Sequence, residues 1–219
     1  MSSTVDNGQV VDPCDASGEV MAPDPPWAPW TPWEVAERLA GIATRWYVVA
    51  GWALDLFRGA TTREHEDIEI GVPAAGFAEV RRALAALECD VVGSGDDGVG
   101  RRWPLGSAAF DQHFQTWFRE PDSGVYRLDV FRDPHDADTW LCRRDPSIRR
   151  PYGDVVRATD AGVPYLSPEV VLLFKAKHRR DKDEADFDGT LPMLSDAERG
   201  WLRAGLETIH PGHPWLARL

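Results

Sequence analysis

Residues 49–69 read VAGWALDLFRGATTREHEDIE, and this stretch decides the fold. A short apolar strand over 46–49 leads into a turn at Ala50-Gly51, and a short helix follows over 52–57 before a glycine ends it. Over 67–72 the side chains alternate, with isoleucine and valine on one face and acids on the other. The stretch therefore predicts a strand, a glycine turn, a helix and a second strand that carries carboxylates.

Asp67 and Glu69 are the residues of this second strand that can carry chemistry. Side chains two residues apart on a strand leave the same face about 6.6 Å apart. Both carboxylates can therefore converge on one or two divalent cations, as two-metal phosphoryl transfer requires. An acid pair on a strand is by itself more often a solvated outer face, so the surrounding residues decide between these two interpretations.

A third carboxylate, Asp129, lies on another predicted strand. Apolar residues alternate over 125–131, and Asp129 shares the polar face of this strand with Arg127. We expect this strand to lie beside the one that carries Asp67 and Glu69, because a two-metal site is seldom complete with two acids.

The glycine turn adds an anion-binding element to these acids. Gly51 precedes a predicted helix N-terminus, where free backbone N–H groups and the positive end of the helix dipole favour phosphate. A turn of this kind shortly before paired acids is typical of a triphosphate site next to a metal site.

The whole run resembles the signature of the aminoglycoside and lincosamide nucleotidyltransferases, which reads Gly-Gly-Trp, a downstream Asp, then Thr-Arg-x-His-x-Asp-Ile-Asp. Similar blocks follow in the same order at 165–177, 182–187 and 210–215, so that the resemblance covers most of residues 32–219. It implies an α/β (α+β) nucleotidyltransferase fold, with a small mixed sheet flanked by helices and a helical C-terminal part.

The resemblance also implies roles for the three acids. Asp67 and Glu69 would bind Mg²⁺, with two ions in the site. Asp129 would be a third metal ligand or the base that deprotonates the acceptor hydroxyl. This chain departs from the signature at two positions. Ala50 replaces the first glycine, which narrows the backbone freedom of the turn, and Glu69 replaces an aspartate, which keeps the charge on a longer side chain.

Nucleotide binding is implied for six further residues. Gly51 and Trp52 would lie against the phosphates, with Arg63 and His65 nearby. Lys175 or Lys177 would offset phosphate charge, and only one of the two needs to face the site, because residues two apart on a helix point in different directions. A solvated helix face is the alternative for each lysine.

The function implied is transfer of AMP, or another nucleoside monophosphate, from ATP or another nucleoside triphosphate to a hydroxyl group of a small molecule. Aminoglycoside- or lincosamide-like antibiotics are the expected acceptors, which would make the chain an antibiotic-resistance enzyme. One alternative is a non-catalytic module of regulatory or antitoxin type that binds a nucleotide or a protein. A second alternative keeps the chemistry and changes the acceptor to a protein side chain or an RNA end.

Composition limits the partners. The net charge is -12, and a protein that grips many phosphates of duplex nucleic acid needs a basic face. No apolar stretch approaches the roughly 18 residues of a membrane span. The three cysteines form no CxxC pair, which fits a reducing cytoplasm. We therefore expect a soluble cytoplasmic protein, monomer or homodimer, without membrane or duplex partners.

The chain divides into three predicted parts. Residues 1–30 are rich in Asp, Ser, Gly and Pro and poor in large aliphatic side chains, which favours a mobile tail. Residues 31–140 would form the catalytic domain, beginning with a helix capped by Thr31 and Glu34. Residues 141–219 would form a linker and the helical part.

Overall fold

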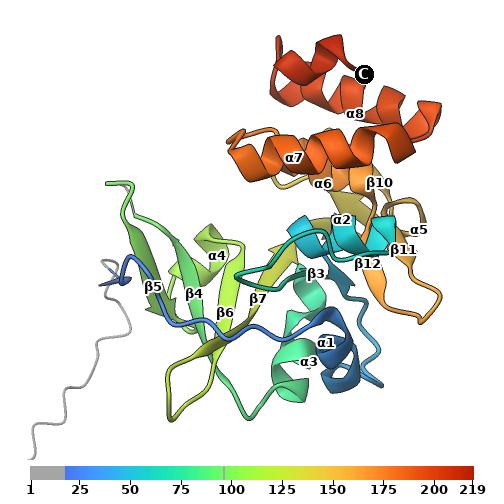
Figure 1. The fold of residues 1–219 in the computed structure, drawn as a ribbon. Helices are drawn as coiled ribbons and strands as arrows, with labels where there is room; N and C mark the ends of the chain where they lie inside the picture. Colours follow the sequence, from blue (N-terminus) through green and yellow to red (C-terminus); the bar gives the residue numbers. More distant parts are fainter. Residues whose placement is uncertain (1–17, 96) are drawn as a thin grey trace, which may run out of the picture.

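The computed structural model describes residues 18–95 and 97–219. Within these residues, nine strands form one mixed sheet in the order β1-β5-β4-β6-β7-β3-β2-β12-β11, and a small sheet has the order β10-β9-β8 (Figure 1). The strands of the large sheet are β1 (Glu19–Val20), β2 (Tyr47–Val48), β3 (Glu69–Pro73), β4 (Glu88–Ser94), β5 (Gly100–Pro104), β6 (Gln115–Arg119), β7 (Tyr126–Asp133), β11 (Val156–Ala158) and β12 (Pro164–Leu166). The small sheet has β8 (His135–Asp136), β9 (Thr139–Leu141) and β10 (Arg149–Pro151).

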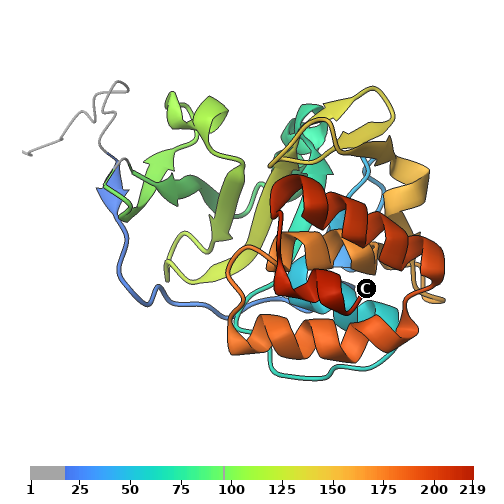
Figure 2. The same ribbon diagram turned by 90° about the horizontal axis from the view of Figure 1, so that it is seen from above.

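Helices cover the sheet and form the C-terminal part. They are α1 (Pro32–Arg38), α2 (Ala50–Arg58), α3 (Phe77–Ala83), α4 (Ala109–Gln112), α5 (Tyr152–Val155), α6 (Pro168–Lys175), α7 (Asp181–Thr190) and α8 (Asp196–Ile209). Single 3-10 turns occur at Ala74–Gly76, Leu191–Met193 and Pro214–Ala217. The view from above shows α6, α7 and α8 grouped over one end of the molecule (Figure 2). None of the helices in the described part of the chain has the length and apolar character that a membrane span needs.

Strand β3 lies at the centre of the fold, antiparallel to β2 and parallel to β7. The alternation predicted for 67–72 is confirmed, since Ile68, Ile70 and Val72 are fully buried. In β7, Leu128 and Val130 are buried on the same core side. The acids therefore leave the opposite face of the sheet, as an alternating strand requires.

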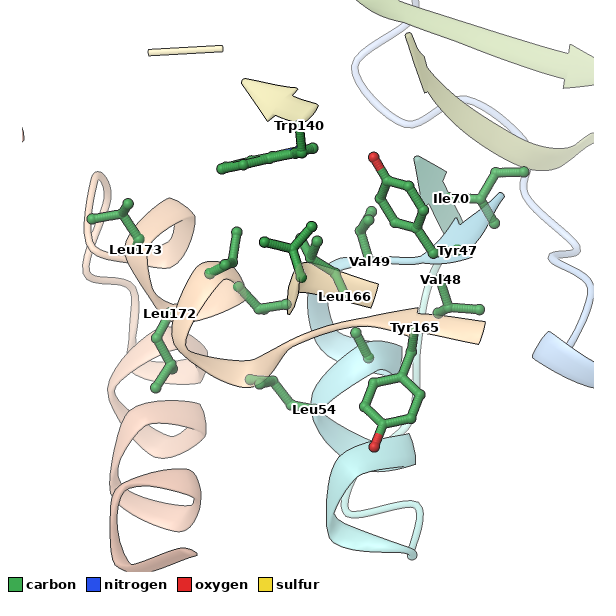
Figure 3. Packing of buried hydrophobic residues seen from close by; sticks show 14 of the residues in the cluster. Tyr47, Val48, Val49, Leu54, Ile70, Trp140, Tyr165, Leu166, Leu172 and Leu173 are labelled. Atoms are coloured by element: carbon green, nitrogen blue, oxygen red, sulfur yellow. The ribbon is translucent and has the colours of Figure 1, made fainter. Parts of the chain in front are cut away.

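The main core joins the sheet to the C-terminal helices. Tyr47 and Val48 of β2, Leu54 of α2 and Leu172 of α6 are all fully buried and belong to one apolar cluster, part of which is drawn in Figure 3. Strands from both sides of residue 140 pair with each other, because β12 is parallel to β2 and β10 is antiparallel to β9. The division of the chain near residue 140 stays a prediction.

Local end signals predicted two helix starts correctly. Thr31 accepts a hydrogen bond from the backbone N–H of Glu34, and the Glu34 side chain accepts one from the Thr31 N–H at 2.8 Å. Ser195 and Glu198 form the same reciprocal cap at the start of α8. Each cap satisfies N–H groups that have no partner within the helix.

Residues 18–30 differ from the predicted mobile tail, whereas residues 1–17 lie outside the described part of the chain. Strand β1 pairs with β5, and Trp27 forms a bridge to Tyr126. The Trp27 ring lies 5.0 Å from the Trp117 ring and 5.4 Å from the Tyr126 ring, measured between centroids. The low content of large aliphatic residues indicated a mobile tail. Two tryptophans in this proline-rich segment nevertheless supply enough apolar area to dock it on the sheet.

Replacing Trp27 tests whether this segment contributes to stability. We expect Trp27→Ala to lower the free energy of unfolding by about 1–3 kcal/mol, because both ring contacts are lost. The matched control is Trp33→Ala, since the Trp33 side chain is 47% exposed. Urea unfolding of both variants gives the measurement, and equal losses would contradict a specific role for Trp27.

Candidate active site

The register of two parallel strands places acids side by side. Glu69 of β3 pairs with Asp129 of β7, and the Asp129 N–H donates to the carbonyl of Ile68 at 2.9 Å. Paired residues of neighbouring strands point to the same face of a sheet. Asp67, one residue before Ile68, is the third member of the group and is exposed. The structure thus places Glu69 beside Asp129, with Asp67 two residues before Glu69, and their joint role at a metal stays a prediction.

These carboxylates have few partners. Within residues 18–95 and 97–219, neither Asp67 nor Glu69 makes a side-chain hydrogen bond or ion pair. Asp129 is 2% exposed, and its Oδ2 accepts a hydrogen bond from Nε2 of Gln115 at 2.6 Å, whereas its buried Oδ1 has no partner. Three uncompensated carboxyl groups therefore share one region of the sheet.

The same arrangement raises two pKa values. Burial, and then the charge of Asp67, raises the pKa of Glu69 to about 7, although Lys175 works against this shift. Burial, and then the charge of Glu69, raises the pKa of Asp129 well above its usual range. The site therefore favours a bound proton or another cation over three free negative charges.

The donor set fits a hard divalent cation. The orphaned Asp129 Oδ1 and the two unpaired carboxylates are the oxygen ligands that Mg²⁺ prefers. In the described part of the chain, no group of three or more His, Cys, Asp or Glu side chains is placed so that it could hold a metal ion. Mg²⁺ is usually held by one or two carboxylates together with substrate phosphates, so Asp67 and Glu69 would need phosphate oxygens as further ligands.

The glycine turn lies beside these acids. The Val49 N–H donates to the Glu69 carbonyl at 2.9 Å, and α2 begins at the next residue without a side-chain cap. Ala50 has φ 53°, in the left-handed region that favours glycine. A Cβ on Gly51 would overlap the Arg63 guanidinium, so only glycine fits there without displacement.

Trp52 and His65 lie behind this turn and outside the cavity described below. Their rings stack with centroids 4.2 Å apart, and His65 Nε2 lies 2.7 Å from Oδ2 of Asp55. Burial lowers the pKa of His65 despite this carboxylate. An ionised Asp55 can only accept, so Nε2 of His65 is the donor of this bond. The two predicted nucleotide ligands therefore brace the turn, and direct contact with phosphate stays a prediction.

Asp55 is a buried charge that the sequence analysis did not assign to the site. It accepts hydrogen bonds from the Thr62 N–H at 3.0 Å and the Thr62 hydroxyl at 2.6 Å. Burial opposes ionisation, but these bonds and that from His65 outweigh it and lower the pKa of Asp55. The sequence did contain a sign of this role. Asp55 occupies a buried position of a helix, and a buried acid needs hydrogen-bond or charged partners.

One cavity of about 570 Å³ connects the acids to the turn. Asp67, Glu69, Ala50, Gly51 and Arg63 line it, whereas Asp129 lies behind Gln115. Although the chain is acidic overall, the wall contains more basic than acidic side chains. The basic residues are Arg63, Arg143, Arg144, Lys175, Lys177, Arg180 and Lys182. This wall suits a polyanion such as a triphosphate.

Both predicted lysines line the cavity, in different settings. Nζ of Lys175 lies 2.8 Å from Asp186 and 3.2 Å from Asp183, and its side chain is only 9% exposed. Lys177 is exposed beyond the end of α6. Acids of α7 therefore fix Lys175 at the cavity.

The sequence analysis did not identify Arg143 and Arg144 as cavity residues, because they belong to an irregular stretch without periodicity.

Comparison with known proteins gives a family match for the segment that contains this turn. Residues 33–96, which include the turn and two of the acids, match the family model described as aminoglycoside-2''-adenylyltransferase. No curated protein matches the chain by sequence. The predicted resemblance is thereby confirmed for this segment.

Solved structures agree with the predicted fold class. The solution structure of the antibiotic-resistance factor ANT(2'')-Ia is 15% identical, covers 80% of this chain and 89% of that chain, and has a TM-score of 0.53. The crystal structure of ANT(2'')-Ia with adenylyl-2''-tobramycin is 14% identical, with 80% and 95% covered and a TM-score of 0.53. The lincomycin-bound lincosamide adenylyltransferase LnuA is 17% identical, with 81% and 94% covered and a TM-score of 0.44. The likeness to ANT(2'')-Ia shows that the chain has the nucleotidyltransferase fold.

Glycine at position 50 tests the strain in the turn. The left-handed backbone conformation costs alanine roughly 1 kcal/mol, and glycine does not have this cost. The strain that is relieved in Ala50→Gly offsets the extra conformational entropy that glycine loses on folding. We expect Ala50→Gly to keep or raise the free energy of unfolding, by at most about 1 kcal/mol. Ala53→Gly is the control, since buried Ala53 lies inside α2 and should lose about 1 kcal/mol or more. Urea unfolding distinguishes the two, and a clear loss in Ala50→Gly would contradict the strain.

Removing the charge of Glu69 tests the electrostatics of the acids. The pKa is about 7 in the folded chain against 4.5 ordinarily, so the folded state holds more protons between these values. This contribution to stability is present at low pH and lost as pH rises through 7. We expect Glu69→Gln to unfold like wild type near pH 5 and to be more stable above about pH 7 in EDTA. Urea unfolding across this range measures the difference, and parallel pH profiles would refute the shift.

Proposed function

We propose that this chain, which carries an adenylyltransferase family segment within a nucleotidyltransferase fold, transfers a nucleoside monophosphate from a nucleoside triphosphate to a small-molecule hydroxyl group. ATP is the default donor, because the matched family is described as adenylyltransferases. One observation carries the proposal: carboxylates without cationic partners and a basic, glycine-lined anion surface face the same cavity.

The acids and the basic wall have complementary tasks. Asp67 and Glu69, with Asp129, would hold Mg²⁺, which when bound offsets triphosphate charge and makes the α-phosphorus easier to attack. Gly51 would bring backbone N–H groups at the start of α2 to phosphate oxygens. Lys175 supplies a positive charge that Asp183 and Asp186 hold in place before any ligand arrives.

Asp129 is the candidate base. The acceptor oxygen would form a bond to the α-phosphorus as the bond to pyrophosphate breaks, and the hydroxyl proton would move to Oδ1 of Asp129, the oxygen without a partner. Gln115 holds the other oxygen at 2.6 Å and fixes the direction of the carboxyl group. Asp129 must become accessible for this role, since it is 2% exposed.

The burial of Asp129 is also the observation that favours a second candidate, a non-catalytic module that binds a nucleotide or a protein partner. Binding without turnover separates the two functions. Calorimetry with Mg·ATP measures binding, and pyrophosphate release with a panel of aminoglycosides, lincosamides and other hydroxyl compounds measures turnover. Release with an acceptor supports the enzyme, whereas binding without release from any acceptor supports the module.

Asp67→Asn tests the catalytic role directly. We expect loss of turnover by about a thousandfold or more, because a metal ligand is removed at the site of phosphoryl charge. The melting temperature should stay within a few degrees, since Asp67 is exposed and has no side-chain partner among the described residues. Asp160→Asn, an exposed acid in a distant turn, is the control for both readouts. Undiminished pyrophosphate release in Asp67→Asn would rule out the role.

A further inference from the structure

The cavity extends past the acids, away from the glycine turn. Val49 is bonded to Glu69, so the turn lies at the beginning of β3. Strand β7 runs parallel to β3 and continues from Asp129 through Phe131 to Asp133, which pairs with Pro73 at the far end of β3. At about 3.3 Å per residue, Asp133 is roughly 13 Å beyond Asp129. Attacking and leaving oxygens lie on opposite sides of the phosphorus, so an acceptor belongs over this far end.

Arg143 is the prominent residue of this far wall. Its guanidinium carbon lies 3.9 Å from the ring centre of Phe131 and 5.0 Å from that of Phe174. Its Nε lies 3.3 Å from Oδ1 of Asp133, a carboxylate that is 3% exposed. The other oxygen of Asp133 accepts a hydrogen bond from the Tyr47 hydroxyl at 2.5 Å. Two rings and a buried carboxylate therefore fix the guanidinium from behind.

The outer nitrogens of Arg143 are available to a ligand. Nη1 and Nη2 make no hydrogen bond or ion pair within the described residues, although the side chain lines the cavity. The neighbouring Arg144 differs, because its nitrogens donate to the carbonyls of Leu173 and Phe174 at 3.1 and 2.7 Å. A fixed guanidinium with two free nitrogens has the shape that binds carboxylate or phosphate oxygens in pairs.

Among the residues that the structure describes, the far wall also offers no unpaired carboxylate to a positively charged acceptor. Residues 112–115 on the β6 side of the cavity are Gln, His, Phe and Gln, and Phe114 is 43% exposed. Asp133 is the acid of this wall, and Arg143 and Tyr47 occupy it. An ammonium group would meet guanidinium groups and neutral side chains there, and its desolvation would be uncompensated.

We propose that the acceptor is a hydroxyl compound that carries a carboxylate or phosphate group, and that Nη1 and Nη2 of Arg143 bind this oxyanion and determine specificity. The inference rests on the proposed nucleotidyl transfer and narrows its acceptor. It separates this chain from an enzyme built for polycationic aminoglycosides, whose amino groups require acidic partners.

Calorimetry on the full chain, saturated with Mg²⁺ and a non-hydrolysable ATP analogue, tests the inference independently of turnover. The probes are glucuronate, glucose and glucosamine, which share a ring and differ in charge, together with glycerol phosphate and tobramycin. We expect glucuronate to bind about tenfold more tightly than glucose, and glucosamine to bind no better than glucose. Glycerol phosphate should compete with glucuronate.

Variants assign the preference to Arg143. Arg143→Gln should remove the difference between glucuronate and glucose, and Arg143→Lys, which keeps a charge beside Asp133, should retain part of it. The matched control is Arg218→Gln, because Arg218 also contacts a carboxylate, Asp188 at 2.6 Å, and a ring, Phe187 at 4.8 Å, but lies outside the cavity. Affinity for the ATP analogue should change less than about threefold in every variant.

Three results would overturn the inference. Tighter binding of glucosamine or tobramycin than of glucuronate would show a cationic acceptor, and equal binding of all probes would show no selection by charge. Weaker binding of the ATP analogue in Arg143→Gln, to the same extent as glucuronate, would assign Arg143 to the triphosphate. Failure to bind the ATP analogue at all, or absence of AMP transfer to every acceptor, would instead refute the proposed function.

Discussion

The parallel pairing of β3 with β7 is the constraint on which the candidate site depends. It places Glu69 directly beside Asp129, and the hydrogen bond from Asp129 to Ile68 fixes the register within one residue. A slip of β3 by one residue would turn Glu69 into the core and expose the isoleucines, and would separate Glu69 from Asp129. Burial of Ile68 and Ile70 therefore holds together two carboxyl groups that repel each other, and the fold supplies the free energy that this repulsion costs.

A second layer of charges joins the helical part to the turn. Asp186 of α7 lies 2.8 Å from Lys175, 3.7 Å from Arg58 and 3.8 Å from Arg63, which come from three separate segments. Arg58 also donates to the Asp186 carbonyl and to Thr190. Because these groups are largely buried, the ion pairs are screened less than surface pairs, and removal of one partner leaves an uncompensated charge. Helix α7 is thus part of the cavity wall.

Local sequence predicted what depends on periodicity and end signals. The alternation of 67–72 and the caps of α1 and α8 are all present in the structure. Ala50 and Gly51 were predicted as a turn before a helix over 52–57, whereas they are the first two residues of α2. The juxtaposition of Asp129 with Glu69 was also predicted, but through the requirement of two-metal chemistry and the family resemblance. The catalytic roles themselves stay predictions.

Other features depend on contacts that no local pattern contains. Residues 109–119 form α4 and then β6. Arg132 of β7 donates to the carbonyls of Phe110 and His113 and fixes the turn between the two elements. Trp52 and His65 were assigned to the nucleotide, whereas their stacking with each other depends on the path of the loop that follows α2. The position of Arg143 in the cavity depends on its contacts with Asp133 and two aromatic rings, which only folding brings together.

The pairing of β1 with β5 affects how readily the protein aggregates through the edges of its sheet. A sheet of nine strands has two open borders, whose unpaired N–H and C=O groups can recruit a strand from another molecule. Here β1 closes one border with only two residues before a proline-rich run, and β11 closes the other with three. Strands this short offer little template for further growth, so the sheet can be wide without inviting aggregation.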